Sequence, residues 1–408
     1  MNQYFINKRL IMLTTKKVIL FFPFPLLSHY LRCLQLASVL KDDFEILFPA
    51  SVTYNSFVFE AGFDTFSCEN FDARAVMEKM NRFDFTWLNT SDIERVFLSQ
   101  VKAIEQYSPV AVLGDAAPTI KMAAEKVNIP YFSLINGYLT KYYDCSRALP
   151  QRFIISQFLH LLPSKPVVWL SNIGEIIVFK NIHIPFSKLR AKYHLNKKNN
   201  YLDELEGDFN FICDLVDIFP QKTLPGNYKI IGPLFYQSDK KENNVLDKIN
   251  NGKRTILIST GSANEIGALE FLKSDYFNKF NIVIAGKTNL LPGKSNVIYN
   301  EFLNTNSILP FVDVTICHGG NGTIYQSLAY GVPVICFPLH MEQEWNAERI
   351  NQLRLGTTLS KINHVKQLME QIEYWMDKKN TPPLKNLATQ ISIDDLKINF
   401  KDEIMRIS

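Results

Sequence analysis

The chain has 408 residues, too many for one hydrophobic core and suited to two or three domains. Hydrophobic residues make up 47% and charged residues 21%, which is ordinary for a globular protein. With 44 basic and 40 acidic side chains the formal net charge is +4, and no dense basic stripe with interleaved aromatic residues is present, so we expect no nucleic-acid partner.

The first apolar segment, residues 18–27, follows two lysines and superficially resembles a signal peptide. It contains two prolines and lacks a small-residue cleavage site, so we interpret it as a buried strand. No segment is long enough to span a membrane, and we expect a cytoplasmic protein.

The strands expected in the first half are short apolar segments separated by helical ones, at 17–22, 44–48, 110–115, 131–135 and 209–213. A capping box beginning at Ser91 predicts a helix that runs to Tyr107, and Pro118 predicts the start of another that ends at Asn128. Residues 146–200 interrupt this alternation and are rich in Phe, Ile, Leu and Trp. They suit a helical addition to the first domain, the wall of an acceptor pocket, or both.

The alternation restarts after Ile231-Gly232-Pro233 and a polar stretch at 238–244, where we place a domain boundary. The strands expected in the second half are 255–260, 280–286, 296–300, 314–318 and 332–338. The sequence therefore predicts an α/β protein made of two similar halves.

The six cysteines include no Cys-x-x-Cys pair, and several, such as Cys213 and Cys317, lie in apolar strand-like segments. This pattern favours buried, reduced thiols over a disulfide framework, with a zinc site as a distant alternative.

The strongest motif is HGGNGTIYQSLAYGVPVICFPLHMEQEWNAERI at residues 318–350. A predicted strand ends at His318, and a glycine-rich turn containing Gly319, Gly320 and Gly322 leads into a helix expected to begin near Thr323. Unpaired N–H groups and the positive end of the helix dipole suit a diphosphate at such a helix start. A glycine-rich loop before a helix is weak evidence when taken alone.

This segment closely resembles the nucleotide-sugar signature of the family 1 glycosyltransferases. The matching positions beyond the glycine turn are Leu328, Gly331, Pro333, Pro338, Glu342, Gln343, Asn346 and Ala347. The resemblance implies the GT-B fold, in which two Rossmann-like domains with parallel sheets face each other across a cleft. It implies an acceptor-binding domain at 1–232, a nucleotide-sugar-binding domain at 233–390, and a terminal helix at 391–408 that returns to the first domain.

Residue by residue, the resemblance implies that His318, Gly322 and Thr323 contact the diphosphate, with Gly319 and Gly320 in the same loop. It also implies that Glu342 and Gln343 bind the hydroxyls of the donor sugar. The alternative for Glu342 is a favourable charge at the start of a helix over 342–354.

Three further donor positions are implied less directly. Gln326 stands where relatives carry a glutamate that binds the ribose, so the preference for uridine over deoxythymidine is open. Phe302 has the spacing of the aromatic residue that stacks on the nucleobase, with a core role as the alternative. Gly261 and Ser262 resemble a Gly-Ser loop near the diphosphate.

The catalytic pair implied by the resemblance is His29 as general base and Asp115 as its partner. Both lie where a predicted strand ends, the edge at which open α/β sheets bind ligands, and histidine titrates near neutral pH. Serine replaces the family's glycine at position 28. Helix capping is the alternative role for each residue.

The function implied is an inverting, metal-free transfer of a hexose from a nucleotide diphosphate, uridine-linked by preference, to a hydroxyl of a small apolar or aromatic acceptor. Such enzymes occur in natural product glycosylation and need no cofactor besides the nucleotide-sugar donor. A lipid or cell-wall acceptor with peripheral membrane contact, and a non-catalytic partner protein of the same fold, are the alternatives. A dehydrogenase is disfavoured because the loop after the first strand contains no glycine.

Overall fold

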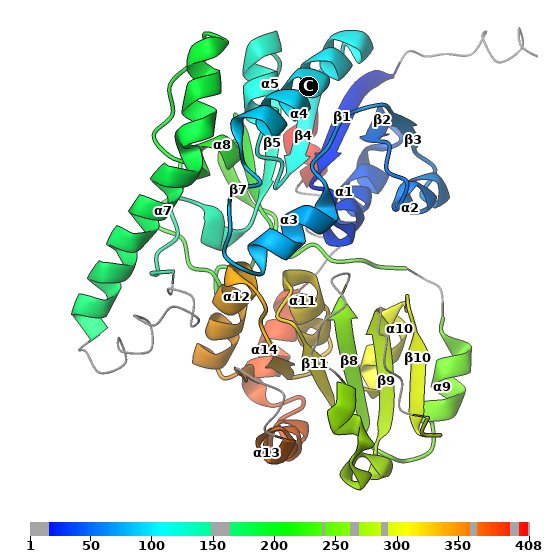
Figure 1. The fold of residues 1–408 in the computed structure, drawn as a ribbon. Helices are drawn as coiled ribbons and strands as arrows, with labels where there is room; N and C mark the ends of the chain where they lie inside the picture. Colours follow the sequence, from blue (N-terminus) through cyan, green and yellow to red (C-terminus); the bar gives the residue numbers. More distant parts are fainter. Residues whose placement is uncertain are drawn as a thin grey trace, which may run out of the picture.

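The computed structural model describes residues 16–147, 164–238, 241–261, 269–286, 293–359, 365–391 and 400–406. The described chain forms two parallel β-sheets with helices on their faces, one lobe above the other in Figure 1. Every strand pair within these sheets is parallel. The predicted α/β class is therefore confirmed.

The first sheet has seven strands in the order β3-β2-β1-β4-β5-β6-β7. Its strands are β1 (Lys17–Pro23), β2 (Phe44–Pro49), β3 (Asp64–Phe66), β4 (Ala111–Asp115), β5 (Tyr131–Ile135), β6 (Phe209–Ile212) and β7 (Tyr228–Ile230). The five expected strands are all present, and the two short strands β3 and β7 lay outside the sequence pattern. Both are edge strands of only three residues, too short to show an alternation of their own.

The helices of this lobe are α1 (Leu27–Leu40), α2 (Asn55–Glu60), α3 (Ala73–Met80), α4 (Thr90–Tyr107), α5 (Ile120–Val127), α7 (Ser164–Lys192) and α8 (Leu202–Leu205), with the 3-10 turn η1 (Gly137–Leu139). The predicted capping box at Ser91 is wrong: Asn89 is the N-cap of α4, and its side chain accepts a hydrogen bond from Asp92 N. Two polar residues able to cap stood two positions apart, and the earlier one is used. The helix expected from Pro118 begins at Ile120 and ends before Asn128, which takes a left-handed conformation.

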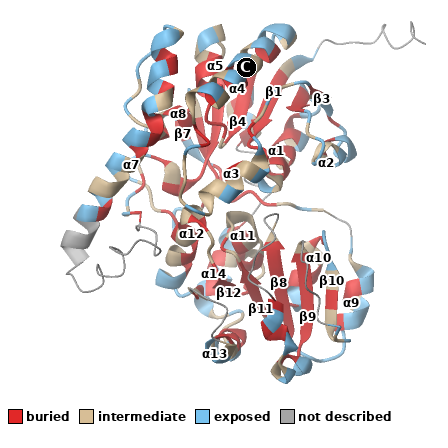
Figure 2. Ribbon diagram, viewed as in Figure 1, coloured by how far each residue is buried: buried red, intermediate tan, exposed pale blue. Residues whose placement is uncertain are grey.

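The second sheet has six strands in the order β10-β9-β8-β11-β12-β13. Its strands are β8 (Thr255–Gly261), β9 (Asn281–Gly286), β10 (Val297–Asn300), β11 (Val314–Cys317), β12 (Val334–Cys336) and β13 (Gly356–Thr358). Around it lie α9 (Asn243–Ile249), α10 (Thr305–Ile308), α11 (Asn321–Ala329), α12 (Met341–Gln352), α13 (Val365–Met376) and α14 (Pro382–Gln390), with the 3-10 turns η2 (Leu269–Lys273), η3 (Asp275–Lys279) and η4 (Leu309–Phe311). The strands are buried while the outward faces of the helices are exposed (Figure 2).

The chain returns to the first lobe at its C-terminal end. Phe400 and Ile404 are buried in the core formed by β1, α1 and β2, and the Phe400 ring lies 4.9 Å from that of Phe211 on β6. The last described segment therefore packs on the N-terminal sheet, although it follows the second sheet in sequence.

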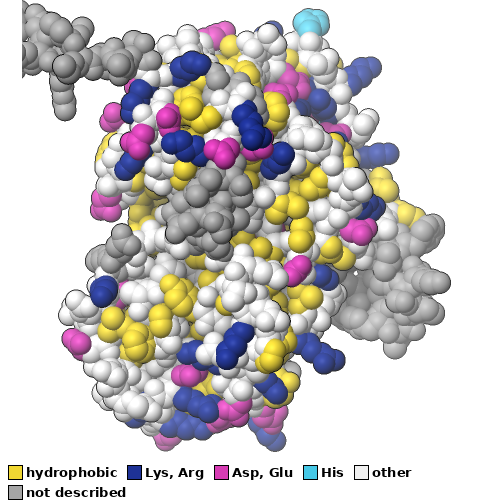
Figure 3. Space-filling model, turned by 180° about the vertical axis from the view of Figure 1, so that it is seen from behind, with side chains coloured by type: hydrophobic (Ala, Val, Ile, Leu, Met, Phe, Trp, Pro, Cys, Tyr) yellow, Lys and Arg dark blue, Asp and Glu magenta, His cyan; other side chains and the backbone are white. Residues whose placement is uncertain are grey.

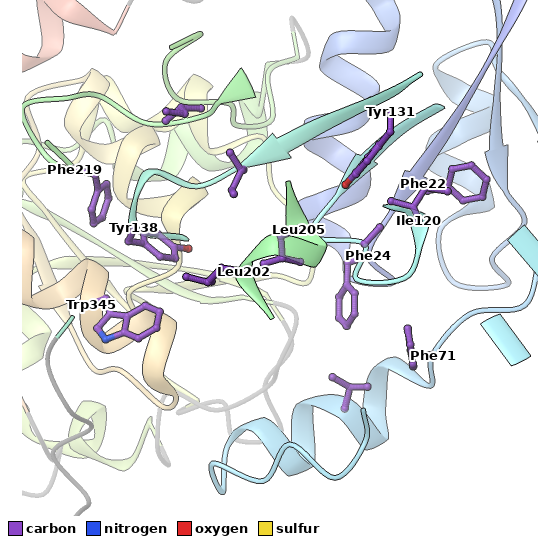
Figure 4. Packing of buried hydrophobic residues seen from close by; sticks show 14 of the residues in the cluster. Phe22, Phe24, Phe71, Ile120, Tyr131, Tyr138, Leu202, Leu205, Phe219 and Trp345 are labelled. Atoms are coloured by element: carbon purple, nitrogen blue, oxygen red, sulfur yellow. The ribbon is translucent and has the colours of Figure 1, made fainter. Parts of the chain in front are cut away.

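The two lobes share one apolar cluster where α11 and α12 meet the first sheet. Tyr138 follows β5, and its ring lies 5.0 Å from that of Phe219 and 5.8 Å from that of Trp345 on α12. Figure 4 shows these three side chains facing one another between ribbons of different lobes. The lobes are therefore held by buried contacts directly beside the strand ends of the first sheet.

Candidate active site

His29 lies in the first turn of α1, and its Nδ1 is 3.1 Å from Oδ2 of Asp115, the last residue of β4. The capping alternatives do not apply: the N-caps of α1 and α5 are Leu26 and Thr119, and neither helix has a side-chain cap. The structure thus brings together the two residues that the sequence analysis named as base and partner.

Arg32, one turn further along α1, binds the same carboxylate. Its Nε donates to Asp115 Oδ2 at 2.9 Å, and its Nη2 donates to Oδ1. Asp115 is fully buried, which by itself raises its pKa, but the charges of Arg32 and His29 and their hydrogen bonds bring the pKa down to about 2. Asp115 is therefore ionised at neutral pH. Sequence reasoning missed Arg32, a charged residue on an otherwise apolar face of α1.

A cluster of three aromatic side chains begins beside His29. The Phe24 ring lies 5.8 Å from the imidazole and 5.8 Å from Trp87, and Phe71 lies 5.3 Å from Trp87. A small pocket at the end of β1 is lined in part by Phe24, Phe71 and Glu69. Of the segment expected as a helical addition or an acceptor wall, 146–200, residues 148–163 lie outside the described residues, and α7 contacts α4. Phe24, Phe71 and Trp87 all precede α4 in the chain.

The predicted diphosphate loop folds tightly around His318. Gly261 has φ +66°, and a Cβ on it would lie 2.4 Å from His318 Cε1; Gly319 has φ +87°, a conformation that favours glycine. Burial lowers the pKa of His318 to about 4, so the imidazole is neutral at pH 7. Gly320 is the N-cap of the nine-residue helix α11 and supplies no side chain, so the helix N-terminus has no side-chain cap. Ser262 lies outside the described residues.

The side chain of Thr323, in the first turn of α11, lies beside the end of β8, with its Oγ1 3.4 Å from Ser259 Oγ. The backbone of Gly322 is open, since the nearest atom to an added Cβ would be 4.0 Å away, on Phe235. This end of α11 can therefore receive an anion at its backbone N–H groups.

Glu342 lies in the first turn of α12 and is half-buried. The hydroxyl of the buried Tyr138, from the other lobe, donates a hydrogen bond to its Oε1. Gln343 is buried, and its Oε1 accepts a hydrogen bond from Leu339 N at 2.8 Å. Of the two predicted sugar-binding residues, Glu342 keeps an oxygen unused by these contacts, while the carbonyl of Gln343 closes the turn before α12.

Gln326 and Phe302 meet at the segment that connects the lobes. Gln326 Nε2 donates to the carbonyl of Tyr236 at 3.0 Å, and the Phe302 ring lies 5.4 Å from that of Tyr236. Phe57 of α2 contacts Phe302 from the first lobe at 5.2 Å. Both ring contacts are edge-on and Phe302 is 43% exposed, so it is not a core residue.

A chain of polar side chains joins the catalytic pair to α11, and sequence reasoning missed it. Arg32 Nη1 donates to Asn136 Oδ1 at 3.1 Å, and Asn136 Nδ2 donates to Asp214 Oδ2 at 3.2 Å. Asp214 Oδ1 in turn accepts from Asn321 Nδ2 at 2.7 Å, across the lobes. Asp115, Asn136 and Asp214 end or follow the neighbouring strands β4, β5 and β6, and that placement was the available signal.

Within the described residues, no cluster of three His, Cys, Asp or Glu side chains has the geometry of a metal site. In the same part of the chain, none of the helices combines the length and apolar character needed to cross a bilayer.

Comparison with known proteins gives concordant results. Residues 268–402 match the family model described as the glycosyltransferase family 28 C-terminal domain. A PGL/p-HBAD biosynthesis glycosyltransferase of Mycobacterium tuberculosis is 23% identical over 339 residues, covering 82% of this chain and 78% of the relative. The calicheamicin glycosyltransferase CalG4 superposes with a TM-score of 0.67 at 17% identity, covering 97% and 98% of the two chains.

The protein is a glycosyltransferase of the GT-B fold. The glycosyltransferase is also 21% identical to a PGL/p-HBAD biosynthesis rhamnosyltransferase of Mycobacterium bovis, over 82% of this chain and 74% of that relative. The resemblance to family 1 enzymes and the predicted fold are therefore confirmed. In this glycosyltransferase the signature segment at 318–350 lies within the matched C-terminal region.

Proposed function

We propose that this glycosyltransferase transfers a hexose, with inversion, from a nucleoside diphosphate donor to a hydroxyl of a small apolar or aromatic acceptor. One observation carries the proposal: His29 Nδ1 lies 3.1 Å from an ionised, fully buried carboxylate, at the sheet edge that contacts α11 through Asp214 and Asn321. A histidine oriented in this way removes a proton from the attacking hydroxyl, and Asp115 stabilises the resulting imidazolium.

The donor diphosphate is proposed to bind at the N-terminus of α11. Gly322 and Thr323 offer backbone N–H groups there, and the neutral His318 side chain packs against Gly261. These groups neutralise the departing diphosphate without a metal or other cofactor. Glu342, oriented by Tyr138, binds sugar hydroxyls with its remaining oxygen.

We propose a uridine nucleotide as the donor. The support is the placement of Gln326 and the half-exposed Phe302 around Tyr236, where a ribose hydroxyl can bind the free amide oxygen of Gln326 and the base can contact the Phe302 ring.

The acceptor is proposed to lie against Phe24, Phe71 and Trp87, whose rings contact one another and of which Phe24 contacts His29. Figure 4 shows the Phe24 and Phe71 side chains close together beside α3. Such a surface favours a flat, apolar acceptor that places one hydroxyl at the imidazole.

A cytoplasmic location fits the six cysteines, which are all unpaired.

A lipid-linked acceptor is the second candidate, and one observation favours it. Ile176, Ile177 and Ile184 of α7 are 54%, 53% and 50% exposed. On the face seen in Figure 3, basic and acidic side chains are interspersed over both lobes. Peripheral contact of α7 with a bilayer would suit an acceptor that is embedded in lipid. Transfer to a short-chain acceptor without vesicles would favour the first candidate.

His29→Ala tests the proposal. We expect the variant to lose transfer, measured as uridine diphosphate released with a panel of phenolic acceptors, while calorimetry shows nearly unchanged binding of uridine diphosphate. The control is His194→Asn, an exposed histidine at the end of α7 whose left-handed backbone asparagine also tolerates. Transfer at the wild-type rate by His29→Ala would refute the assignment of the base.

A further inference from the structure

Arg32 differs from an ordinary surface arginine in burial and in the number of its partners. Its side chain is 7% exposed, and its guanidinium binds both oxygens of Asp115 and the amide oxygen of Asn136. Burial by itself lowers the pKa of Arg32, yet the charge of Asp115 holds it well above its usual value. The cation is therefore permanent in the folded protein.

Two parallel hydrogen bonds fix the plane of a carboxylate. In this protein they turn Oδ2 of Asp115 toward His29, whose Nδ1 is 3.1 Å away. Burial without a counter-charge raises the pKa of a carboxyl group, and the charge of Arg32 lowers the pKa of Asp115. Arg32 thus supplies both the charge and the orientation that the pair requires.

The guanidinium is itself held in place. Asn136 accepts from Arg32 and donates to Asp214, and Asp214 also accepts from Gly137 N at 2.7 Å. Asn321, at the start of α11, donates to the other oxygen of Asp214. The position of Arg32 is consequently coupled to the helix at which the donor diphosphate is proposed to bind.

We propose that Arg32 is a positioning residue of the transfer reaction, which locks the Asp115 carboxylate against His29 and connects this pair through Asn136 and Asp214 to the start of α11. The inference rests on the proposed function, since it presumes His29 as the base. Its effect on His29 is exerted through Asp115.

The charged and titratable groups that face Arg32 limit what a pH titration can report. They are His29 and Cys33 on α1, Asp115 on β4, Tyr138 after β5, and Cys213 and Asp214 after β6. Burial raises the pKa of the tyrosine and of both thiols, so these three stay neutral in a neutral assay. Asp115 stays ionised in such an assay, so among these neighbours with a shifted pKa only Asp214, with a pKa of about 6, changes charge near neutral pH.

The test compares Arg32→Gln with Arg32→Lys, each with a pH–rate profile and a histidine NMR titration in which the His29 signal is assigned by its loss in His29→Gln. In Arg32→Gln we expect kcat to fall by about 100-fold because the pair is misplaced. We also expect the acidic limb and the His29 signal to shift upward by about one pH unit, because a fixed positive charge is removed from the His29–Asp115 pair. Arg32→Lys keeps the charge but loses the two-pronged contact, so its kcat should fall by about 10-fold with both midpoints near those of the wild type.

Reading the NMR signal of His29 itself separates its titration from that of Asp214. The matched control is Arg74→Gln on α3, whose side chain is 90% exposed, and it should change neither kcat nor midpoint. Unchanged midpoints in Arg32→Gln with only a loss of thermal stability would overturn the inference in favour of a structural role. Failure of the proposed function is seen separately, as transfer by His29→Ala.

Discussion

Asp115→Asn is expected to destabilise the protein strongly, beyond its effect on catalysis. Asp115 is fully buried, and Arg32, its main partner, has a side chain that is 7% exposed. Asparagine is nearly the same size, so no cavity forms. The guanidinium loses its only charged hydrogen-bonding partner among the described residues and keeps only neutral amide oxygens, that of Asn136 and that of the introduced asparagine. Breaking a buried ion pair by removing one partner costs about 3–5 kcal/mol.

Urea denaturation followed by tryptophan fluorescence measures this loss, and the buried Trp87 in the same lobe reports on it. The exposed Arg74–Glu78 pair gives a control, since Glu78→Gln should change the free energy of unfolding by less than about 1 kcal/mol.

The double variant Arg32→Gln, Asp115→Asn tests whether the stability contributions of these two residues depend on each other. Without either charge, the two amides can still bond to each other, so the double variant should cost less than the sum of the single variants by about 2 kcal/mol or more. Both single variants and the double variant should have little transfer activity. Additive single costs would refute the claim that Arg32 and Asp115 are an interdependent buried pair.

Three further outcomes are expected. Tyr138→Phe removes the hydroxyl that orients Glu342 and leaves no cavity. The KM for the donor should rise by about 10-fold, which is equivalent to losing a charge-assisted hydrogen bond of about 1.5 kcal/mol. An unchanged KM would show that Tyr138 has no role in donor binding. Gln326→Glu places a carboxylate against the Tyr236 carbonyl and should lower the free energy of unfolding by about 1–3 kcal/mol. Tighter binding of uridine diphosphate with unchanged stability would instead mean that this side chain contacts only the ribose. Burial raises the pKa of Asp214 to about 6, so the stability contributed by its protonated form is fully present below about pH 4 and is lost as the pH rises through 6. Asp214→Asn should therefore remove about 3 kcal/mol of the pH dependence of the free energy of unfolding, measured by urea titration. Parallel pH curves for the two proteins would contradict this expectation.

The alternation of apolar strands and helices could be read from the sequence because both sheets are parallel and covered on both faces. Strands such as Tyr131–Ile135 and Asn281–Gly286 are then nearly continuous apolar segments with clear limits. Features set by single hydrogen bonds could not be read in this way. Asn89 rather than Ser91 caps α4 because its side chain reaches Asp92 N, and that choice depends on the local path of the chain.

The candidate site divides in the same manner. His29 and Asp115 could be named because each follows a strand and matches a motif, and their distance of 3.1 Å agrees with that pairing. Arg32 could not be named from the sequence, because there it is one polar residue in an apolar helix. Its role becomes visible only in the structure, where β4 places the Asp115 carboxylate beside it. The partners Tyr138 and Asn321 act across the two lobes, and such contacts depend on tertiary packing that the sequence pattern does not encode.

Thermal unfolding in the presence of uridine, deoxythymidine, guanosine and adenosine diphosphates, with NAD as a control, tests the central claim most directly. A ligand at a hundred times its dissociation constant stabilises the folded protein by about 2.7 kcal/mol. Gly320→Val, whose Cβ would lie 2.6 Å from His318 Nε2, supplies the matched variant with a blocked loop. The account predicts a shift with uridine diphosphate in the wild type and none in Gly320→Val. Absence of a shift with every diphosphate, or an equal shift in the blocked variant, would contradict a donor site at the start of α11.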